Sequence, residues 1–117
     1  MARKTLVLVG LIGALLTGTV TAQVTTLPNG VAAGDVDQTS VMLWTRSANV
    51  GTVTFEVATD TAFSQMVATL TAEVSDPLLP VKVEVTGLTA GTQYSYRATD
   101  TTGVTSSGTF RTDRKSV

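Results

Sequence analysis

The residues that could carry out chemistry in this chain are carboxylates and hydroxyls, because histidine and cysteine are both absent. Histidine is the commonest metal ligand and a frequent general base. Serine and threonine are abundant, but none lies in the Gly-x-Ser-x-Gly turn that exposes a hydrolase nucleophile. Glycine-rich phosphate loops and zinc motifs are also missing. We therefore predict that this chain has no catalytic residue, no metal site and no cofactor of its own.

Asp35 and Asp37 are the most suggestive pair, since their spacing matches the start of a calcium-binding loop. Such a loop needs a third oxygen ligand and a distal glutamate. Only Thr39 is available for the third ligand, and the glutamate is missing. An aspartate in this context usually caps a turn by accepting hydrogen bonds from the following backbone. We expect a turn cap, with a metal site as the alternative.

Two arginines are candidates for binding. Arg46 follows Trp44, the only tryptophan, at the end of an apolar segment and could bind an anion or contact a neighbouring domain. The alternative is a surface arginine whose stem covers apolar area. Arg97 is expected to face outward from its strand, where it can pair across the sheet with Glu56 or Glu84.

The first 22 residues have the pattern of a secretory signal peptide. Arg3 and Lys4 supply the positive start, an apolar run covers 5–16, and Val20-Thr21-Ala22 places small residues before a cleavage site at Gln23. A membrane anchor is the alternative, but the run is shorter than the ~20 residues that a spanning helix needs. We expect an exported protein, periplasmic or extracellular, with no membrane segment after cleavage.

The elements after the signal peptide are short strands. The chain has 117 residues, 43% of them hydrophobic, which suits one small domain. Its net charge of −1 gives no basic footprint for nucleic acid. Period-two segments separated by turn residues predict an all-β, seven-stranded immunoglobulin-like or fibronectin type III-like sandwich over 23–112, followed by a polar tail or linker start at 113–117. The expected strands are 31–33, 39–46, 52–58, 66–74 (as one or two edge strands), 81–85, 93–99 and 105–112.

The second of these strands does not alternate. Its middle, Val41-Met42-Leu43-Trp44, is apolar at every position, whereas a strand with one solvated face should alternate. We predict that Met42 and Trp44 face the core, with Trp44 as its anchor. Val41 and Leu43 would then form an outward apolar patch of the kind that marks an interface.

One corner carries a more specific signal. Leu88, Gly91 and Tyr94 have the spacing of a tyrosine corner, in which the tyrosine hydroxyl reaches back to the backbone a few residues upstream. The alternative is that Tyr94 is only a core aromatic residue. The glycine at the bend favours the corner.

Several phrases of the sequence resemble the N-terminal domain of PhoD-like alkaline phosphatases. The most specific are Gly30-Val31-Ala32-Ala33-Gly34-Asp35 and Leu43-Trp44-Thr45-Arg46. Further likeness lies at 55–60, 83–97 and 108–112, so the resemblance covers roughly residues 27–112. The later phrases are shared with fibronectin type III domains in general and, more distantly, with the N-terminal domains of purple acid phosphatases.

The resemblance implies an accessory role. In such proteins the sandwich precedes a larger metallophosphoesterase domain, which holds the metal ligands and hydrolyses phosphate esters. None of that domain's metal motifs occurs here, so no catalytic residue is carried over, and the expected partner is the missing catalytic domain. We expect a non-catalytic accessory domain, as a gene fragment, that docks through Val41, Leu43 and Arg46. The alternative is a stand-alone secreted binding or adhesion module.

Overall fold

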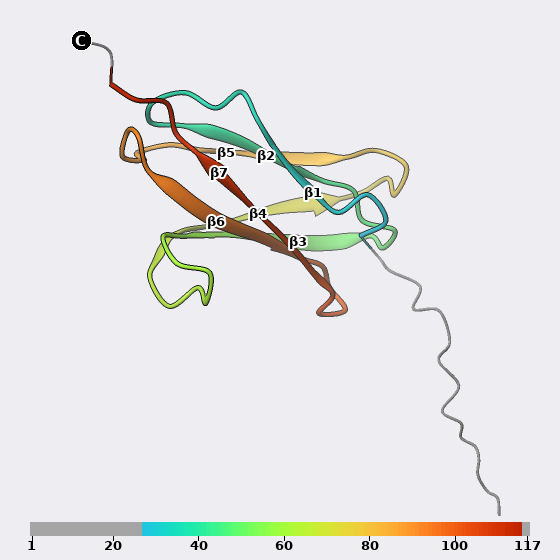
Figure 1. Cartoon of the computed structure of the whole chain (residues 1–117). Coiled ribbons are helices and arrows are strands. Elements are labelled where there is room, and N and C mark those ends of the chain that lie inside the picture. The colour runs from blue at the N-terminus through green and yellow to red at the C-terminus, as the bar shows by residue number, and fades with distance from the viewer. Residues whose placement is uncertain (1–26, 116–117) are drawn as a thin grey trace, which may run out of the picture.

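The structure is a computed structural model that describes residues 27–115 (Figure 1). The predicted signal peptide, 1–22, lies outside the described residues, as do the last two residues of the tail. Over the described range the chain contains no helix that could cross a membrane. Its elements are β1 (Val31–Gly34), β2 (Val41–Thr45), β3 (Gly51–Ala58), β4 (Met66–Val74), β5 (Val81–Val85), β6 (Gln93–Thr99) and β7 (Thr105–Arg111).

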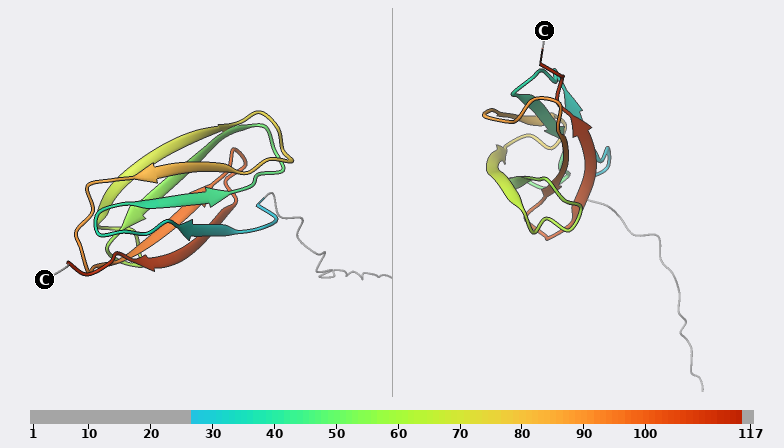
Figure 2. Two further views of the ribbon diagram at one scale, coloured as in Figure 1. Left: turned by 90° about the horizontal axis from the view of Figure 1, so that it is seen from above. Right: turned by 60° about the vertical axis from the view of Figure 1, so that its left-hand side comes forward.

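The strands form two antiparallel sheets packed face to face. One sheet has the order β1-β2-β5 and the other has the order β4-β3-β6-β7. All five strand pairings are antiparallel. Figure 2 shows the two layers, with β4 and β7 at opposite rims of the four-stranded sheet. The predicted all-β, seven-stranded sandwich is confirmed, and segment 66–74 is a single edge strand.

The alternating strands bury the residues that their period-two pattern indicates. Val53, Phe55 and Val57 of β3 and Val85 of β5 are buried between the sheets. Tyr94 and Phe110 stack across β6 and β7 with ring centroids 5.4 Å apart. Because no cysteine crosslinks the sheets, this apolar core is the main term that offsets the conformational entropy lost on folding.

The predicted orientation of β2 is wrong. Val41 and Leu43 are buried, with 1% and 0% of their surface exposed, while Met42 and Trp44 are only partly buried. Both sets are apolar, so hydrophobicity alone could not choose the inward face. The register decides it: Val41 lies opposite Val85 and Leu43 lies opposite Val83, whereas Met42 and Trp44 lie opposite the charged Glu84 and Lys82. The apolar pairs take the core side. Val41 and Leu43 are therefore core residues, not an interface patch, and Trp44 is not the core anchor.

The tyrosine corner is confirmed. The Tyr94 hydroxyl accepts a hydrogen bond from the Thr89 N–H at 2.9 Å, and the ring is buried. Gly91 has a φ of +62°, a conformation that favours glycine at the bend. Leu88 is buried, and its N–H donates to the Thr39 carbonyl at 2.9 Å. The corner thus ties the β5–β6 connection to the turn before β2.

Candidate functional site

Asp37 acts as a turn cap. Its Oδ1 accepts hydrogen bonds from the Thr39 N–H at 2.8 Å and the Ser40 N–H at 2.7 Å. The Thr39 N–H, together with Ser40, holds the pKa of the Asp37 carboxyl below its usual value. Asp35 lies in the left-handed region, with a φ of 47°. Residues 27–115 contain no group of three potential metal ligands, so the described geometry gives the calcium-loop alternative no support.

The outer face of the four-stranded sheet is polar. Thr71, Thr54, Thr99 and Thr105 form a row across β4, β3, β6 and β7. The next row contains the Glu56–Arg97 ion pair, with Arg97 Nε 2.6 Å from Glu56 Oε1. This confirms the first of the two predicted partners for Arg97.

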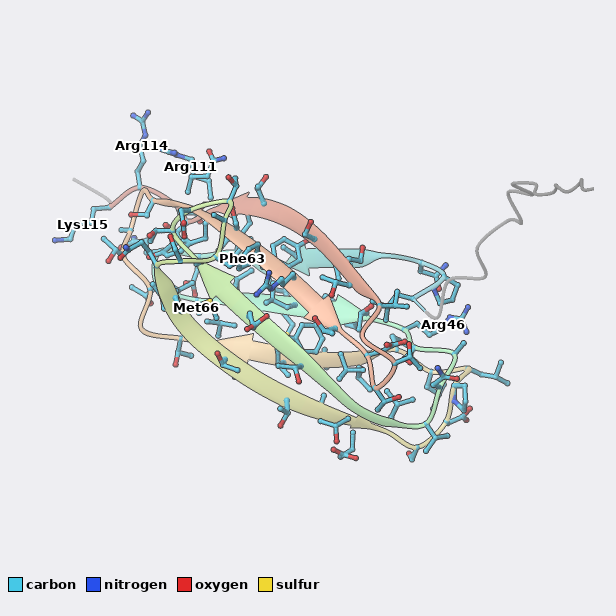
Figure 3. All side chains as sticks on the ribbon, turned by 90° about the horizontal axis from the view of Figure 1, so that it is seen from below. Arg46, Phe63, Met66, Arg111, Arg114 and Lys115 are labelled. Carbon is cyan, nitrogen blue, oxygen red and sulfur yellow. The ribbon has the colours of Figure 1, made fainter. Side chains whose placement is uncertain are left out.

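A single aromatic side chain reaches this polar face from a connecting loop. Phe63 lies in the β3–β4 connection and is partly buried. Figure 3 labels Phe63. The guanidinium carbon of Arg97 is 4.1 Å from its ring centroid. The contact fits a cation–π interaction and holds Phe63 across the sheet surface. The face as a whole suits contact with water.

The outer face of the three-stranded sheet is different. Because Val41, Leu43 and Thr45 of β2 point into the core, Met42 and Trp44 point away from it. Trp44 lies opposite Ala32 of β1, and Met42 lies opposite Gly34. We call this surface, made of Ala32, Gly34, Met42, Trp44, Lys82 and Glu84, the Trp44 face.

Trp44 has close neighbours on both adjacent strands of this face. A side chain on Gly34 would place its Cβ 3.5 Å from Trp44 Nε1, so the indole covers the glycine. On the other side, Lys82 Nζ of β5 lies 4.8 Å from the ring centroid. This distance fits a cation–π contact, which favours a defined ring position over a freely rotating side chain.

A groove of about 220 Å³ opens beside the ring. It runs from the turn before β1 across the end of β2 to the start of β5. Its lining is mostly apolar, as in pockets that bind ligands. The groove is lined by Asn29, Gly30, Val31, Ala32, Trp44, Thr45, Arg46 and Pro80.

Arg46 lies at one end of the groove and is held there by two hydrogen bonds. Its Nε donates to Asn29 Oδ1 at 2.8 Å and its Nη1 donates to the Pro77 carbonyl at 2.8 Å. The side chain therefore ties the turn before β1 to the β4–β5 loop. Figure 3 shows Arg46 at one end of the sandwich, with Arg111, Arg114 and Lys115 at the other. Arg46, which was predicted as an interface residue, lines the groove and holds two loops together.

The β4–β5 loop extends the apolar surface at this end. Leu78 is 79% exposed and Leu79 is 59% exposed, directly before the groove residue Pro80. Sequence reasoning predicted a loop here from Pro77 and Pro80 but missed its exposed leucines and the outward Trp44. The run Leu78-Leu79 between two prolines was the available signal, since an apolar pair in a loop that proline excludes from the ladder has no strand to bury it.

A family model supplies the deciding comparison. The model described as "PhoD-like phosphatase, N-terminal domain" matches residues 14–114. The chain belongs to this family. Two phrases that carry the resemblance in the sequence, 30–35 and 43–46, supply six of the eight residues that line the groove. The two phrases that resemble the family therefore come together at one surface site.

Solved structures agree with this assignment. The structure of PhoD has 32% sequence identity and a TM-score of 0.66; the match covers 74% of this chain and 19% of that one. The chain thus spans about a fifth of the length of that relative. A search of curated proteins finds no match.

Two more distant structures share the fold alone. The sensor domain of the anti-sigma factor RsgI4 from Pseudobacteroides cellulosolvens has 14% identity and a TM-score of 0.63, covering 80% of this chain and all of that one. The fn3 domain of human collagen alpha-1(XX) has 16% identity and a TM-score of 0.52, covering 86% of this chain and 93% of that one. The predicted fibronectin type III-like sandwich is thereby confirmed.

Proposed function

We propose that this chain is a non-catalytic accessory domain of an exported PhoD-like phosphatase, and that it docks on the metallophosphoesterase domain through the Trp44 face. The convergence of the two family phrases on the groove carries this proposal. Residues that serve only the fold would line the core, but Ala32, Trp44 and Arg46 line an open groove instead.

The contrast between the two outer faces supports the same proposal. Both faces belong to one small domain, yet one is hydroxyl-rich and the other holds the only tryptophan. A partly exposed tryptophan beside a groove is a common anchor of protein interfaces. In the PhoD structure the matched sandwich is only 19% of the chain, which leaves ample protein to cover such a face.

A binding experiment tests the docking. The full chain is titrated with the metallophosphoesterase domain of a family member produced without its own sandwich, and the dissociation constant is measured by calorimetry. We expect Trp44→Ala to weaken binding by roughly ten-fold or more, which corresponds to about 1.4 kcal/mol.

A matched pair of charge insertions controls for position. Ala32 lies in the groove and Thr109 lies on the outer face of the other sheet; both are exposed strand residues. Ala32→Lys should weaken binding and Thr109→Lys should leave it unchanged. Equal effects of the two substitutions, or no binding by the wild-type chain, would contradict docking through the Trp44 face.

The non-catalytic role has its own assay. The purified chain, supplied with divalent or ferric metal, should hydrolyse neither phosphomonoesters nor phosphodiesters above background. Turnover that copurifies with the chain and follows its concentration would contradict the proposal.

Export is tested at the amino terminus. If 1–22 is a signal peptide, secreted material begins at Gln23, and amino-terminal sequencing of the exported protein will find that residue. Retention of Met1 on material recovered outside the cytoplasm would refute cleavage at this position.

The second candidate function is a stand-alone binding module. The outward Trp44, beside a groove with Arg46 and Asn29 at its end, is the observation that favours it. An aromatic ring with polar groups around it can stack on a glycan ring as well as anchor a protein. Glycan-array binding that is lost in Trp44→Ala, with no affinity for the metallophosphoesterase domain, would select this candidate over docking.

A further inference from the structure

The free edge of β4 is unlike the other strand edges of the molecule. β4 is the longest strand, with nine residues, and lies at the end of its sheet. Natural edge strands avoid pairing with other chains by being short, or by carrying lysine, proline or a bulge. Two of the other edge strands have such features, since β1 has four residues and β5 has five with Lys82 among them. The third, β7, has seven residues and is shorter than β4.

β4 lacks these protective features over most of its length. Its register against β3 shifts at the amino-terminal end, where Ala58 pairs with Met66 and Val57 pairs with Ala68. From Ala68 to Val74 the pairing is regular, with no proline or lysine and with Glu73 as the one charge. This seven-residue stretch can pair through its free backbone groups.

We propose that this edge is a self-association surface, on which β4 of a second copy adds antiparallel and joins the two four-stranded sheets into one. In the register that pairs all seven regular residues, Thr71 lies on the two-fold axis, opposite Thr71 of the second copy. Glu73 then lies opposite Thr69, so the two like charges do not meet.

The side chains in this register are complementary in size. On the core side, where Leu70 and Ala72 pack against the core cluster, Leu70 lies opposite Ala72 of the second copy and Ala68 lies opposite Val74. Each large residue thus faces a small one. On the outer side, Thr71 lies opposite Thr71 and Thr69 lies opposite Glu73 of the second copy. These polar pairs can stay in contact with water when the two strands pair.

Substitutions at Thr71 test this arrangement sharply, because the residue is exposed and the axis brings its two copies together. The wild-type chain should show a concentration-dependent dimer in sedimentation equilibrium. Thr71→Lys and Thr71→Glu should each weaken self-association by about five-fold or more, since each places like charges opposite one another. An equimolar mixture of the two variants should recover the dimer as a heterodimer.

Thr54→Lys is the matched control. Thr54 lies opposite Thr71 on the central strand β3 of the same face. The lysine there has the same charge but does not lie at the edge, so the dimer should persist. Circular dichroism and a melting curve establish that each variant is folded.

The proposal does not rest on docking through the Trp44 face, and the two can fail separately. A wild-type chain that stays monomeric at millimolar concentration would overturn it. So would a dimer that survives both Thr71 variants, or one that dissociates only in Trp44→Ala. The proposal would also be overturned if the chain were monomeric and Thr71→Lys abolished its binding to the metallophosphoesterase domain. That result would show that the β4 edge contacts that domain.

Discussion

Tyr94 shows how one hydroxyl organises a connection between the two sheets. Its ring is buried beside Phe110, while its hydroxyl accepts the Thr89 N–H. The Gly91 N–H in turn donates to the Asp113 carbonyl at 2.8 Å, so the corner also holds the chain after β7. The corner therefore secures the end of the domain from which the chain leaves.

Removing that hydroxyl should destabilise the fold. Tyr94→Phe keeps the ring but leaves the Thr89 N–H without its partner, so we expect a loss of about 1–3 kcal/mol in the free energy of unfolding, measured in urea. Tyr96→Phe is the control, because no hydrogen bond to the Tyr96 hydroxyl is present among residues 27–115 and burial raises its pKa. Equal losses for the two variants would argue against the corner bond.

Gly108 is required by the ring of Tyr96. The two residues pair across β6 and β7, and a Cβ at position 108 would lie 2.9–3.1 Å from three atoms of the Tyr96 side chain. Gly108→Ala should cost about 1–3 kcal/mol, as overpacking does, in the same urea assay. Gly34→Ala is the matched strand control, because its Cβ would meet only Trp44 Nε1, at 3.5 Å. A Gly108→Ala variant as stable as Gly34→Ala would show that the ring moves aside freely.

Asp100 makes stability depend on pH. Burial raises its pKa, but hydrogen bonds from the Thr102 hydroxyl and from the N–H groups of Thr102 and Val104 outweigh this, so the pKa lies below the ordinary 3.8. The unfolded chain then binds the proton more readily than the folded one. Stability is fully present above the ordinary value and falls as pH drops below it.

Substitution of Asp100 checks this sign. Asp100→Asn can keep the acceptor oxygen but removes the titration. The variant should be less stable at neutral pH and should lose less stability than the wild type between about pH 6 and pH 3, followed by melting temperature. An acid response as steep as that of the wild type would place the pH dependence elsewhere.

At the scale of the element, β2 is the strand whose two faces are both apolar, and each face has a separate role. Val41 and Leu43 join the core, while Met42 and Trp44 form the outer surface. Leu43→Ala should cost about 2–5 kcal/mol, because the side chain is fully buried. Met42→Ala should cost much less. If chemical denaturation instead showed a larger loss for Met42→Ala than for Leu43→Ala, Met42 and Trp44 would face the core, as the sequence predicted.

Strand alternation explains which elements could be predicted. In β3 and β5 the apolar residues occur at every second position, so the inward face follows from the sequence. In β2 it does not, because the choice depends on the register with β5 and on Trp44 resting over Gly34. For this reason the prediction that Val41 and Leu43 form a docking surface was wrong. The tyrosine corner was predicted correctly because glycine and tyrosine have distinct local roles.

The candidate site was less predictable than the fold. Its groove joins residues from the turn before β1, the end of β2 and the start of β5, which lie far apart in the sequence. Arg46 was singled out from its position after Trp44, but its two hydrogen bonds depend on where Asn29 and Pro77 fall in space. No local pattern encodes that convergence.

At the scale of the whole molecule, the sandwich has one surface suited to water and one suited to a partner. The row of threonines and the Glu56–Arg97 pair cover the four-stranded sheet. Apolar area is exposed on the Trp44 face and at Leu78 and Leu79 at one end, with Met66 and Val67 adding to it at the start of β4. The proposed docking would need this asymmetry, because the domain must stay folded through its core while leaving a second apolar surface for its partner.

The single tryptophan reports on this asymmetry directly. Because Trp44 lies outside the core, unfolding the free chain should shift its emission only modestly, whereas a core tryptophan would shift strongly to the red. Acrylamide should quench Trp44 in the folded chain, and Lys82→Ala should increase the quenching by uncovering the ring. Binding of the metallophosphoesterase domain should then shift the emission to the blue and protect the ring. If that domain binds while Trp44 stays equally quenched, docking occurs on another surface of the sandwich.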